Sequence, residues 1–218
     1  MSKFKLVIFD MDGLLVDSEI HYSDGWQYGL TKEGINVSKK ITDSWLGQGK
    51  QKSIDYLNNK IQNEEIVDRV VRHREDYIYD IIETDKMNEQ SNATSTLKYL
   101  KEKGISIGVA SSTHRERAEL ILTKLGLFEY VDYACFGDEV ENVKPAPDIY
   151  NDVIDHFKYN KAEILAVEDS STGVQAAKAA GLQVIMITDN EEEKKDVLNK
   201  EIKVTILKDL SNIFNFLT

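Results

Sequence analysis

The sequence predicts an α/β protein: a doubly wound parallel sheet of the Rossmann-like kind with an inserted α-helical domain. Two observations support this prediction. After residue 85, short apolar runs rich in β-forming residues alternate with amphipathic helical stretches, several of them closed by glycine. Before residue 85, a single early strand is followed by a long segment of helical pattern. Strands that alternate with helices over short connections form a parallel sheet covered on both faces.

The first expected strand is Leu6 to Phe9, which is too short for a helix and carries apolar residues throughout. Met11-Asp12-Gly13 breaks that pattern. Helices are then expected at 23–33, 53–60 and 63–82, with a loop marked by Gly47 and Gly49.

The second half of the chain predicts the rest of the sheet and its helices. Strands are expected at residues 105–110, 133–136, 164–167 and 184–187, and helices at 93–103, 115–125, 148–157 and 173–180. We therefore expect an α/β core domain of residues 1–15 and 85–218, interrupted by a helical domain of residues 16–84.

Composition excludes several classes of function. The 218 residues are 41% hydrophobic and carry a net charge of −11, so nucleic acid and anionic membranes are poor partners. Apolar runs are too short to span a membrane, and the first residues lack a signal-peptide pattern. The single Cys135 excludes an internal disulfide and is expected to be a small buried side chain. A cytoplasmic monomer is the default expectation.

Polar residues follow the expected strands. Because ligands bind at the carboxyl edge of a parallel sheet, these side chains are the candidates for a functional site. They are four carboxylates, a run of hydroxyls and one lysine: Asp10, Asp12, Ser111, Ser112, Thr113, Lys144, Glu168 and Asp169.

This set predicts phosphoryl-transfer chemistry that depends on Mg²⁺. Two carboxylates about 4 Å apart repel by roughly 4 kcal/mol at an effective dielectric of 20, and a hard cation with oxygen ligands offsets that repulsion. Beside the cation, Asp10 could attack a phosphoryl group. Lys144 would balance its charge, Ser111 would donate a hydrogen bond, and Asp12 could serve as acid and then base.

Four motifs carry a resemblance to a known family. Residues 10–19 (DMDGLLVDSE), 109–113 (VASST), 144–150 (KPAPDIY) and 168–173 (EDSSTG) resemble, in order, the four motifs of the haloacid dehalogenase (HAD) superfamily. The resemblance covers essentially the whole chain and is to the phosphatase and phosphomutase branch. Dehalogenases and phosphonatases of that superfamily lack the second aspartate, which here is Asp12.

The resemblance implies a role for each matching residue. Asp10 would be the phosphorylated nucleophile and a Mg²⁺ ligand, and Asp12 the acid and base, with its backbone carbonyl on the metal. Asp169 would bind the metal, with Glu168 on it or next to it. The phosphoryl group would be held by Ser111, Ser112 and Lys144. The helical domain would be a mobile cap that closes over the substrate and excludes water.

Two departures from the family pattern fall in the expected cap. Tyr22 stands where relatives often carry a histidine, with His21 one place earlier, and the loop before Gly47 lacks a lysine, although Lys50 follows. Tyr22 and Lys50 are the expected substrate contacts in this cap. Both departures favour a phosphatase acting on a small phosphorylated metabolite, such as a sugar phosphate, over an isomerase of the β-phosphoglucomutase type. A non-catalytic binding protein on the same fold is a third alternative.

Some polar and aromatic residues have structural interpretations. Thr113 and Asp138 are expected as helix caps. His73, flanked by Arg72 and Arg74, is expected on a solvated helix face, and a substrate-facing role for this basic cluster is the alternative. Trp26 and Trp45 are expected in the core of the helical domain.

Overall fold

The computed structural model describes residues 3–46 and 50–217, so the expected loop at Gly47 and Gly49 lies outside the described residues. The chain forms two compact units, one of residues 1–17 and 89–218 and one of residues 18–88. The two boundaries lie after residues 17 and 88, where the sequence predicted them after residues 15 and 84. At the first boundary, Val16 forms isolated β-bridges with Asp12 and Glu89. The Gln90 N–H also donates to the Leu15 carbonyl at 2.9 Å. That the second unit is a cap remains a proposal.

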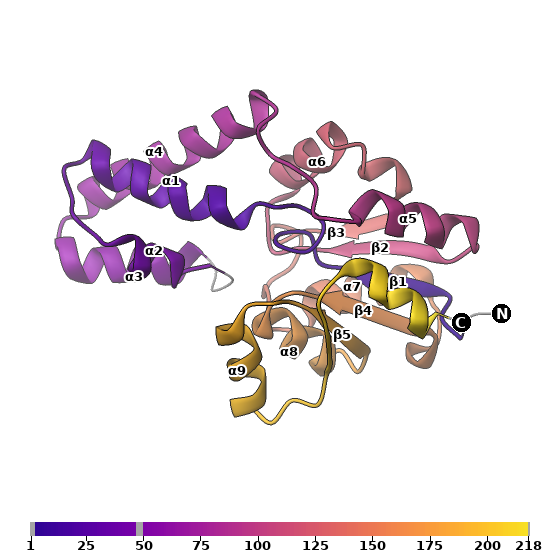
Figure 1. Cartoon of the computed structure of the whole chain (residues 1–218). Helices are drawn as coiled ribbons and strands as arrows, with labels where there is room; N and C mark the ends of the chain where they lie inside the picture. Colours follow the sequence, from indigo (N-terminus) through magenta and orange to yellow (C-terminus); the bar gives the residue numbers. More distant parts are fainter. Residues whose placement is uncertain (1–2, 47–49, 218) are drawn as a thin grey trace. The chain divides into compact units, whose positions relative to one another are not determined.

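The first unit contains a six-stranded parallel sheet, which confirms the predicted fold class (Figure 1). Its spatial order is β3-β2-β1-β4-β5-β6, so the chain winds outward in both directions from β1. The strands are β1 (Leu6–Phe9), β2 (Ser106–Ala110), β3 (Tyr133–Cys135), β4 (Ile164–Glu168), β5 (Gln183–Ile187) and β6 (Thr205–Leu207). In the register, Phe9 lies opposite Val109 on one side and Val167 on the other. Residues that follow β1, β2 and β4 therefore emerge at one edge.

Helices cover both faces of this sheet. Against β2 lie α5 (Ala93–Glu102) and α7 (Asp148–Phe157), and against β4 and β5 lies α8 (Ser171–Ala179). The remaining helical elements are α6 (Arg115–Lys124), α9 (Glu191–Asn199) and the short 3-10 helices η1 (Phe128–Tyr130), η2 (Lys161–Glu163) and η3 (Leu210–Phe216). α9 and β6 follow the last predicted strand and were not expected from the sequence.

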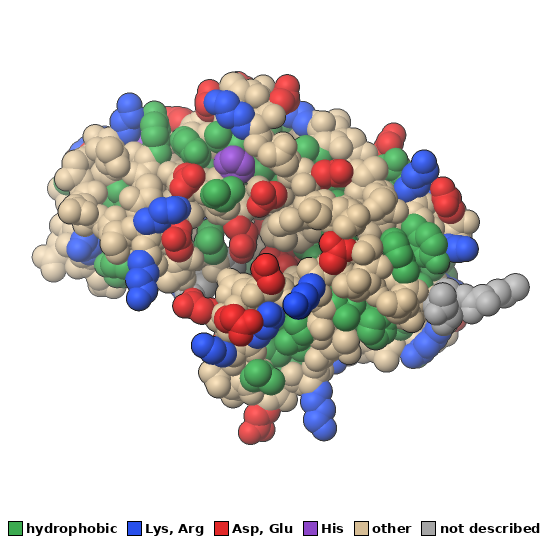
Figure 2. Space-filling model, viewed as in Figure 1, with side chains coloured by type: hydrophobic (Ala, Val, Ile, Leu, Met, Phe, Trp, Pro, Cys, Tyr) green, Lys and Arg blue, Asp and Glu red, His purple; other side chains and the backbone are tan. Residues whose placement is uncertain are grey.

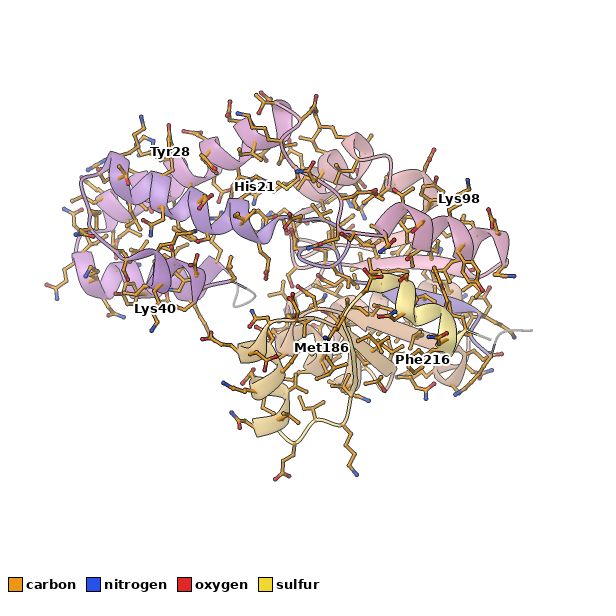
Figure 3. The ribbon with its side chains drawn as sticks, in the orientation of Figure 1. His21, Tyr28, Lys40, Lys98, Met186 and Phe216 are labelled. Atoms are coloured by element: carbon orange, nitrogen blue, oxygen red, sulfur yellow. The ribbon has the colours of Figure 1, made fainter. Side chains whose placement is uncertain are left out.

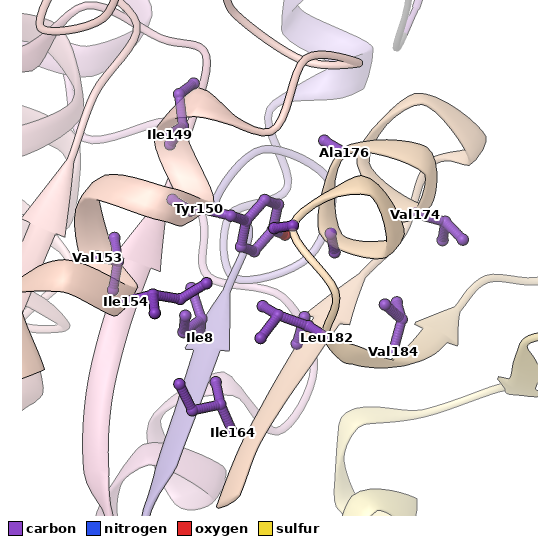
Figure 4. Packing of buried hydrophobic residues seen from close by; sticks show 14 of the residues in the cluster. Ile8, Ile149, Tyr150, Val153, Ile154, Ile164, Val174, Ala176, Leu182 and Val184 are labelled. Carbon is purple, nitrogen blue, oxygen red and sulfur yellow. The ribbon is translucent and has the colours of Figure 1, made fainter. Parts of the chain in front are cut away.

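The core beneath α7 and α8 is apolar and closely filled. Ile8 of β1, Ile164 of β4 and Tyr150 of α7 are fully buried in one cluster (Figure 4). Cys135 belongs to the same cluster and is 1% exposed, which confirms it as a small buried side chain. All four residues of β1 are buried, as expected for a central strand covered on both faces.

The second unit consists of α1 (Glu19–Lys32), α2 (Lys39–Asp43), α3 (Lys50–Ile61) and α4 (Glu64–Glu83) within the described residues. The backbones of α1 and α4 approach closely at Gly29. A Cβ at this position would overlap the Val70 carbonyl oxygen, so only glycine fits there. The Asn63 side chain begins α4 by accepting the Ile66 N–H at 3.2 Å. The five-residue α2 was not predicted.

Two expectations for this unit have opposite outcomes. Trp26 and Trp45 are buried with ring centroids 5.4 Å apart, edge to face, which confirms them as core residues. The prediction of a solvated basic face holds for Arg72, which is exposed, but was wrong for Arg74, which is 6% exposed. Its Nη1 lies 2.5 Å from Glu75 Oε1, and its guanidinium carbon lies 4.8 Å from the Trp26 ring centroid, so an ion pair and a cation–π contact stabilise the buried charge.

The face seen in Figure 2 carries acidic and basic side chains, with hydrophobic side chains exposed between them in several places. Among the helices that the structure describes, none combines the length and apolarity required to cross a bilayer.

Candidate active site

Three chain segments meet at the carboxyl edge of the sheet. Asp10, directly after β1, donates its backbone N–H to the Val167 carbonyl of β4 at 3.0 Å. Ser111, directly after β2, donates its backbone N–H to the Cys135 carbonyl of β3 at 3.2 Å. One carboxylate oxygen from each of three acidic residues then lies within 4.8 Å of the others; these residues are Asp10, Glu168 and Asp169.

Lys144 enters this acidic cluster from the loop between β3 and α7. Its side chain is 6% exposed, and its Nζ contacts Asp10 Oδ1 and lies 2.6 Å from Glu168 Oε1. The peptide bond between Lys144 and Pro145 is cis. Burial lowers the pKa of Lys144, but the charges of Asp10 and Glu168 outweigh that effect and raise it, so the lysine stays protonated.

Asp10 is buried, with 7% of its surface exposed. Burial raises the pKa of Asp10 to about 7 against the opposing effect of Lys144, and the charges of Glu168 and Asp12 add to the rise. One lysine therefore does not fully compensate the carboxylates at this edge, and a further cation would favour their ionised forms.

Glu168 is completely buried at the end of β4. Its Oε1 accepts hydrogen bonds from Lys144 at 2.6 Å and from the Tyr150 hydroxyl at 2.5 Å. Across residues 3–46 and 50–217, no hydrogen-bond partner reaches its Oε2. A Cβ at Gly173 would overlap both carboxylate oxygens, so a glycine in the first turn of α8 makes the space that Glu168 occupies.

These residues fit a magnesium ion. The donors are carboxylate oxygens, which Mg²⁺ prefers, and Glu168 Oε2 is a buried acceptor of the kind that is normally satisfied. Asp10, Glu168 and Asp169 would hold the ion. The other predicted metal ligand, Asp12, would contribute its backbone carbonyl.

Asp12 is half-buried and accepts two hydroxyl hydrogen bonds at Oδ2. The donors are Thr113 at 2.7 Å and Ser111 at 3.3 Å. A tight turn follows, in which Gly13 has a φ of +80° and its N–H donates to the Val16 carbonyl at 2.8 Å. That backbone conformation favours glycine and directs the chain away from the sheet edge directly after Asp12.

The loop after β2 corrects one prediction and confirms another. Thr113 was expected to cap the following helix, but its hydroxyl binds Asp12 and His114 is the residue before α6. Asp138 does cap that helix, because its carboxylate accepts the Arg115 N–H at 2.8 Å. Of the two serines predicted to bind phosphate, Ser111 is fully buried, whereas the side chain of Ser112 is exposed.

The loop after β3 holds the Ser111–Thr113 loop in place. The Gly137 N–H donates to the Thr113 carbonyl at 3.0 Å, and a Cβ at Gly137 would overlap the Ser112 carbonyl oxygen. The loop that carries the hydroxyls of Ser111 and Thr113 is therefore held in position by the segment that follows β3.

The two expected substrate contacts lie in the helical unit. Tyr22 is half-buried on α1, and its ring centroid is 5.4 Å from the Arg74 guanidinium carbon. Lys50 is exposed at the start of α3, where its Nζ lies 3.4 Å from Glu75 Oε1. Figure 3 shows His21 on α1, one residue before Tyr22. Their roles toward a substrate stay predictions.

We expect the substitution Gly173→Ala to destabilise the protein. Alanine in a helix is ordinarily about 1 kcal/mol more stable than glycine. Here the added Cβ would displace a buried carboxylate that binds Lys144 and Tyr150, and overpacking of this kind costs about 1–3 kcal/mol. Urea unfolding should show a net loss in the free energy of unfolding; an increase would contradict the close contact between Gly173 and Glu168.

A parallel sheet that gathers a buried carboxylate, a buried lysine and further carboxylates at its switch point defines an enzyme of the α/β class. Residues 7–187 match the family model of haloacid dehalogenase-like hydrolases. The chain belongs to that family, as the four sequence motifs predicted.

Individual relatives agree with this assignment. A phosphorylated carbohydrates phosphatase of Thermotoga maritima is 28% identical over 179 residues, which are 82% of this chain and 82% of that protein. A solved Thermotoga maritima structure, provisionally assigned as a beta-phosphoglucomutase, is 27% identical with a TM-score of 0.78 and coverage of 97% of both chains. The beta-phosphoglucomutase of Clostridium difficile shares the fold, with 22% identity, a TM-score of 0.78 and coverage of 96% of this chain and 93% of that chain.

Proposed function

We propose that this protein is a Mg²⁺-dependent phosphatase that hydrolyses a small phosphorylated metabolite, of the sugar-phosphate class, through an aspartyl-phosphate on Asp10. The observation that carries the proposal is the buried Asp10 carboxylate, held by Lys144 beside two further carboxylates. The similarity to a phosphorylated carbohydrates phosphatase supports the substrate class.

The residues at the sheet edge divide the reaction into two steps. Asp10 attacks phosphorus, the bond to the ester oxygen breaks, and Asp12 gives its proton to the departing alcohol. Asp12 then takes a proton from a water molecule that attacks the same phosphorus, and the bond to Asp10 breaks to release phosphate. Lys144 and Ser111 hold the phosphoryl oxygens. Bound Mg²⁺ would neutralise charge that develops on the transferred group.

A β-phosphoglucomutase-type isomerase is the alternative, and the similarity to the provisionally assigned mutase favours keeping it. The first step would be the same, but the phosphoryl group would return to the sugar. Tyr22, at the position where relatives often carry histidine, favours the phosphatase.

Phosphate release from a panel of sugar and other small phosphates tests the proposal. The panel contains β-glucose 1-phosphate, each reaction contains Mg²⁺, and the Asp10→Asn variant serves as the blank. Release above the blank that stops on chelation supports the phosphatase. Conversion of β-glucose 1-phosphate to glucose 6-phosphate without release would establish the isomerase instead, and full activity in excess chelator would contradict the metal.

We expect Mg²⁺ to stabilise the fold more at pH 8 than at pH 6. Because the pKa of Asp10 in the folded protein is raised to about 7, above its unfolded value, the metal-free protein loses stability as pH rises through that range. Protons also compete with Mg²⁺ for the carboxylate, so apparent affinity should fall about tenfold from pH 8 to pH 6, or about 1.4 kcal/mol. Thermal unfolding with and without Mg²⁺ measures this difference. An equal or larger Mg²⁺ effect at pH 6 would contradict it.

A further inference from the structure

Tyr150 is a fully buried tyrosine whose hydroxyl reaches the acidic cluster. It lies on α7, where its ring packs among Ile8 and other side chains of the core and its hydroxyl points toward α8 (Figure 4). The hydroxyl donates to Glu168 Oε1 at 2.5 Å. None of the reaction steps described above uses this residue.

The contacts of Glu168 assign different tasks to its two oxygens. Oε1 accepts from both Tyr150 and Lys144, while Oε2 is buried and without a hydrogen-bond partner among the described residues. The absence of a side chain at Gly173 leaves the room for this carboxylate. Lys144 is shared with Asp10, so Tyr150 is the hydrogen-bond donor that serves Glu168 without also contacting Asp10.

We propose that Tyr150 is a positioning residue that fixes the Glu168 carboxylate by its Oε1, so that Oε2 is available to a divalent cation. Tyr150 would act on the metal through Glu168 and would not contact substrate. A hydroxyl that donates to the second oxygen of a ligating carboxylate orients the ligand before the ion binds. Loss of a hydrogen-bond donor of this kind typically lowers metal affinity about 10–100-fold. The inference rests on the Mg²⁺ site of the proposed function and adds a residue to it.

The chemistry of the pair supports this assignment. Tyr150 is fully buried, and its hydroxyl carries one proton that it can donate. A carboxylate only accepts, and the direction of the hydrogen bond is therefore settled by the chemistry of the pair. Loss of the donor would leave Lys144 alone to hold Oε1.

The test compares the affinity of purified protein for Mg²⁺ in the wild type and in Tyr150→Phe, by titration calorimetry. Phenylalanine keeps the ring in the core and removes only the hydroxyl. We expect the dissociation constant for Mg²⁺ to rise about 10–100-fold. The matched control is Tyr133→Phe, which removes a tyrosine hydroxyl that donates to the Asp152 carboxylate at 2.8 Å, outside the cluster, and should leave the dissociation constant unchanged.

A second comparison keeps the inference testable if Tyr150→Phe does not fold. In Glu168→Gln and in the double variant Glu168→Gln/Tyr150→Phe, residue 168 is a neutral amide, so loss of the Tyr150 hydroxyl does not leave a buried charge at this position with fewer hydrogen bonds. If Tyr150 acts through Glu168, the two should bind Mg²⁺ equally, and a further loss in the double variant would overturn the proposal.

The outcomes separate this inference from the proposed function. Tyr150→Phe with wild-type affinity for Mg²⁺ overturns the role of Tyr150, whether or not the enzyme releases phosphate. Weaker binding in that variant upholds the role even if no panel compound is hydrolysed. A wild type that binds no Mg²⁺ overturns both the metal site and the role of Tyr150.

Discussion

Asp10→Asn should abolish turnover while the protein stays folded. The side chain keeps its shape, but an amide oxygen does not form the aspartyl-phosphate on which the proposed reaction depends. Lys144 retains its contact with Glu168, so its charge is not left buried alone. Removal of a covalent nucleophile typically lowers kcat by several orders of magnitude, and we expect a loss of at least about a thousandfold. Steady-state phosphate release with the best compound of the panel measures it.

A matched control makes that result specific. Asp155→Asn makes the same chemical change at an exposed position on α7 and should leave activity unchanged. Near-wild-type activity in Asp10→Asn, with mass spectrometry showing that the asparagine has not reverted to aspartate, would contradict the assignment of the nucleophile.

Lys144→Met should destabilise the protein, and more so at high pH. The substitution leaves Asp10 and Glu168 buried without their shared cation, and breaking a buried ion pair on one side costs about 3–5 kcal/mol. Without the lysine, the pKa of Asp10 in the folded state rises further above its unfolded value. The folded protein then binds more protons than the unfolded chain, so stability falls as pH rises. Urea unfolding at pH 5 and pH 8 should show the larger loss at pH 8.

The comparison variant for this prediction is Lys101→Met. Lys101 lies 2.5 Å from Asp132, but both side chains are more than a third exposed, and such pairs contribute about 0–1 kcal/mol. A loss in Lys144→Met no larger than that in Lys101→Met, or a larger loss at pH 5 than at pH 8, would show that the buried cluster does not depend on its lysine.

The sequence predicted most of the core because its strands are buried on both faces. Such strands are continuous apolar runs, as in β1 and β4, and glycine closes the helices between them. α9 and β6 lack these signals: α9 is mostly charged, and none of the three residues of β6 is buried. The short α2 was missed for the same reason, since one of its five residues is buried.

At the candidate site, the residues found from the sequence are those that directly follow a strand or stand in a recognisable motif. The hydroxyl contacts of Tyr150 with Glu168 and of Thr113 with Asp12 were not predicted because they are tertiary: Tyr150 had no assigned role, and Thr113 was expected to cap a helix. Tyr150 occupies an apolar position in the pattern of α7. The one signal in the sequence is that a tyrosine at a buried position needs a hydrogen-bond partner for its hydroxyl. Arg74 was misjudged because neighbouring charges suggested solvent, whereas the aromatic rings that bury it come from α1.

The pairing of β1 with β4 has a consequence for synthesis of the chain. Phe9 is aligned with Val167, so the residue after β1 meets Lys144 and Glu168 only once most of the polypeptide exists. Contacts between residues so distant in sequence form late, because closing the long loop between them costs conformational entropy. A nascent or truncated product that ends before β4 therefore carries the aspartate without Glu168 and Asp169. Recovery of catalysis during refolding should then report completion of the central sheet rather than the formation of any single helix.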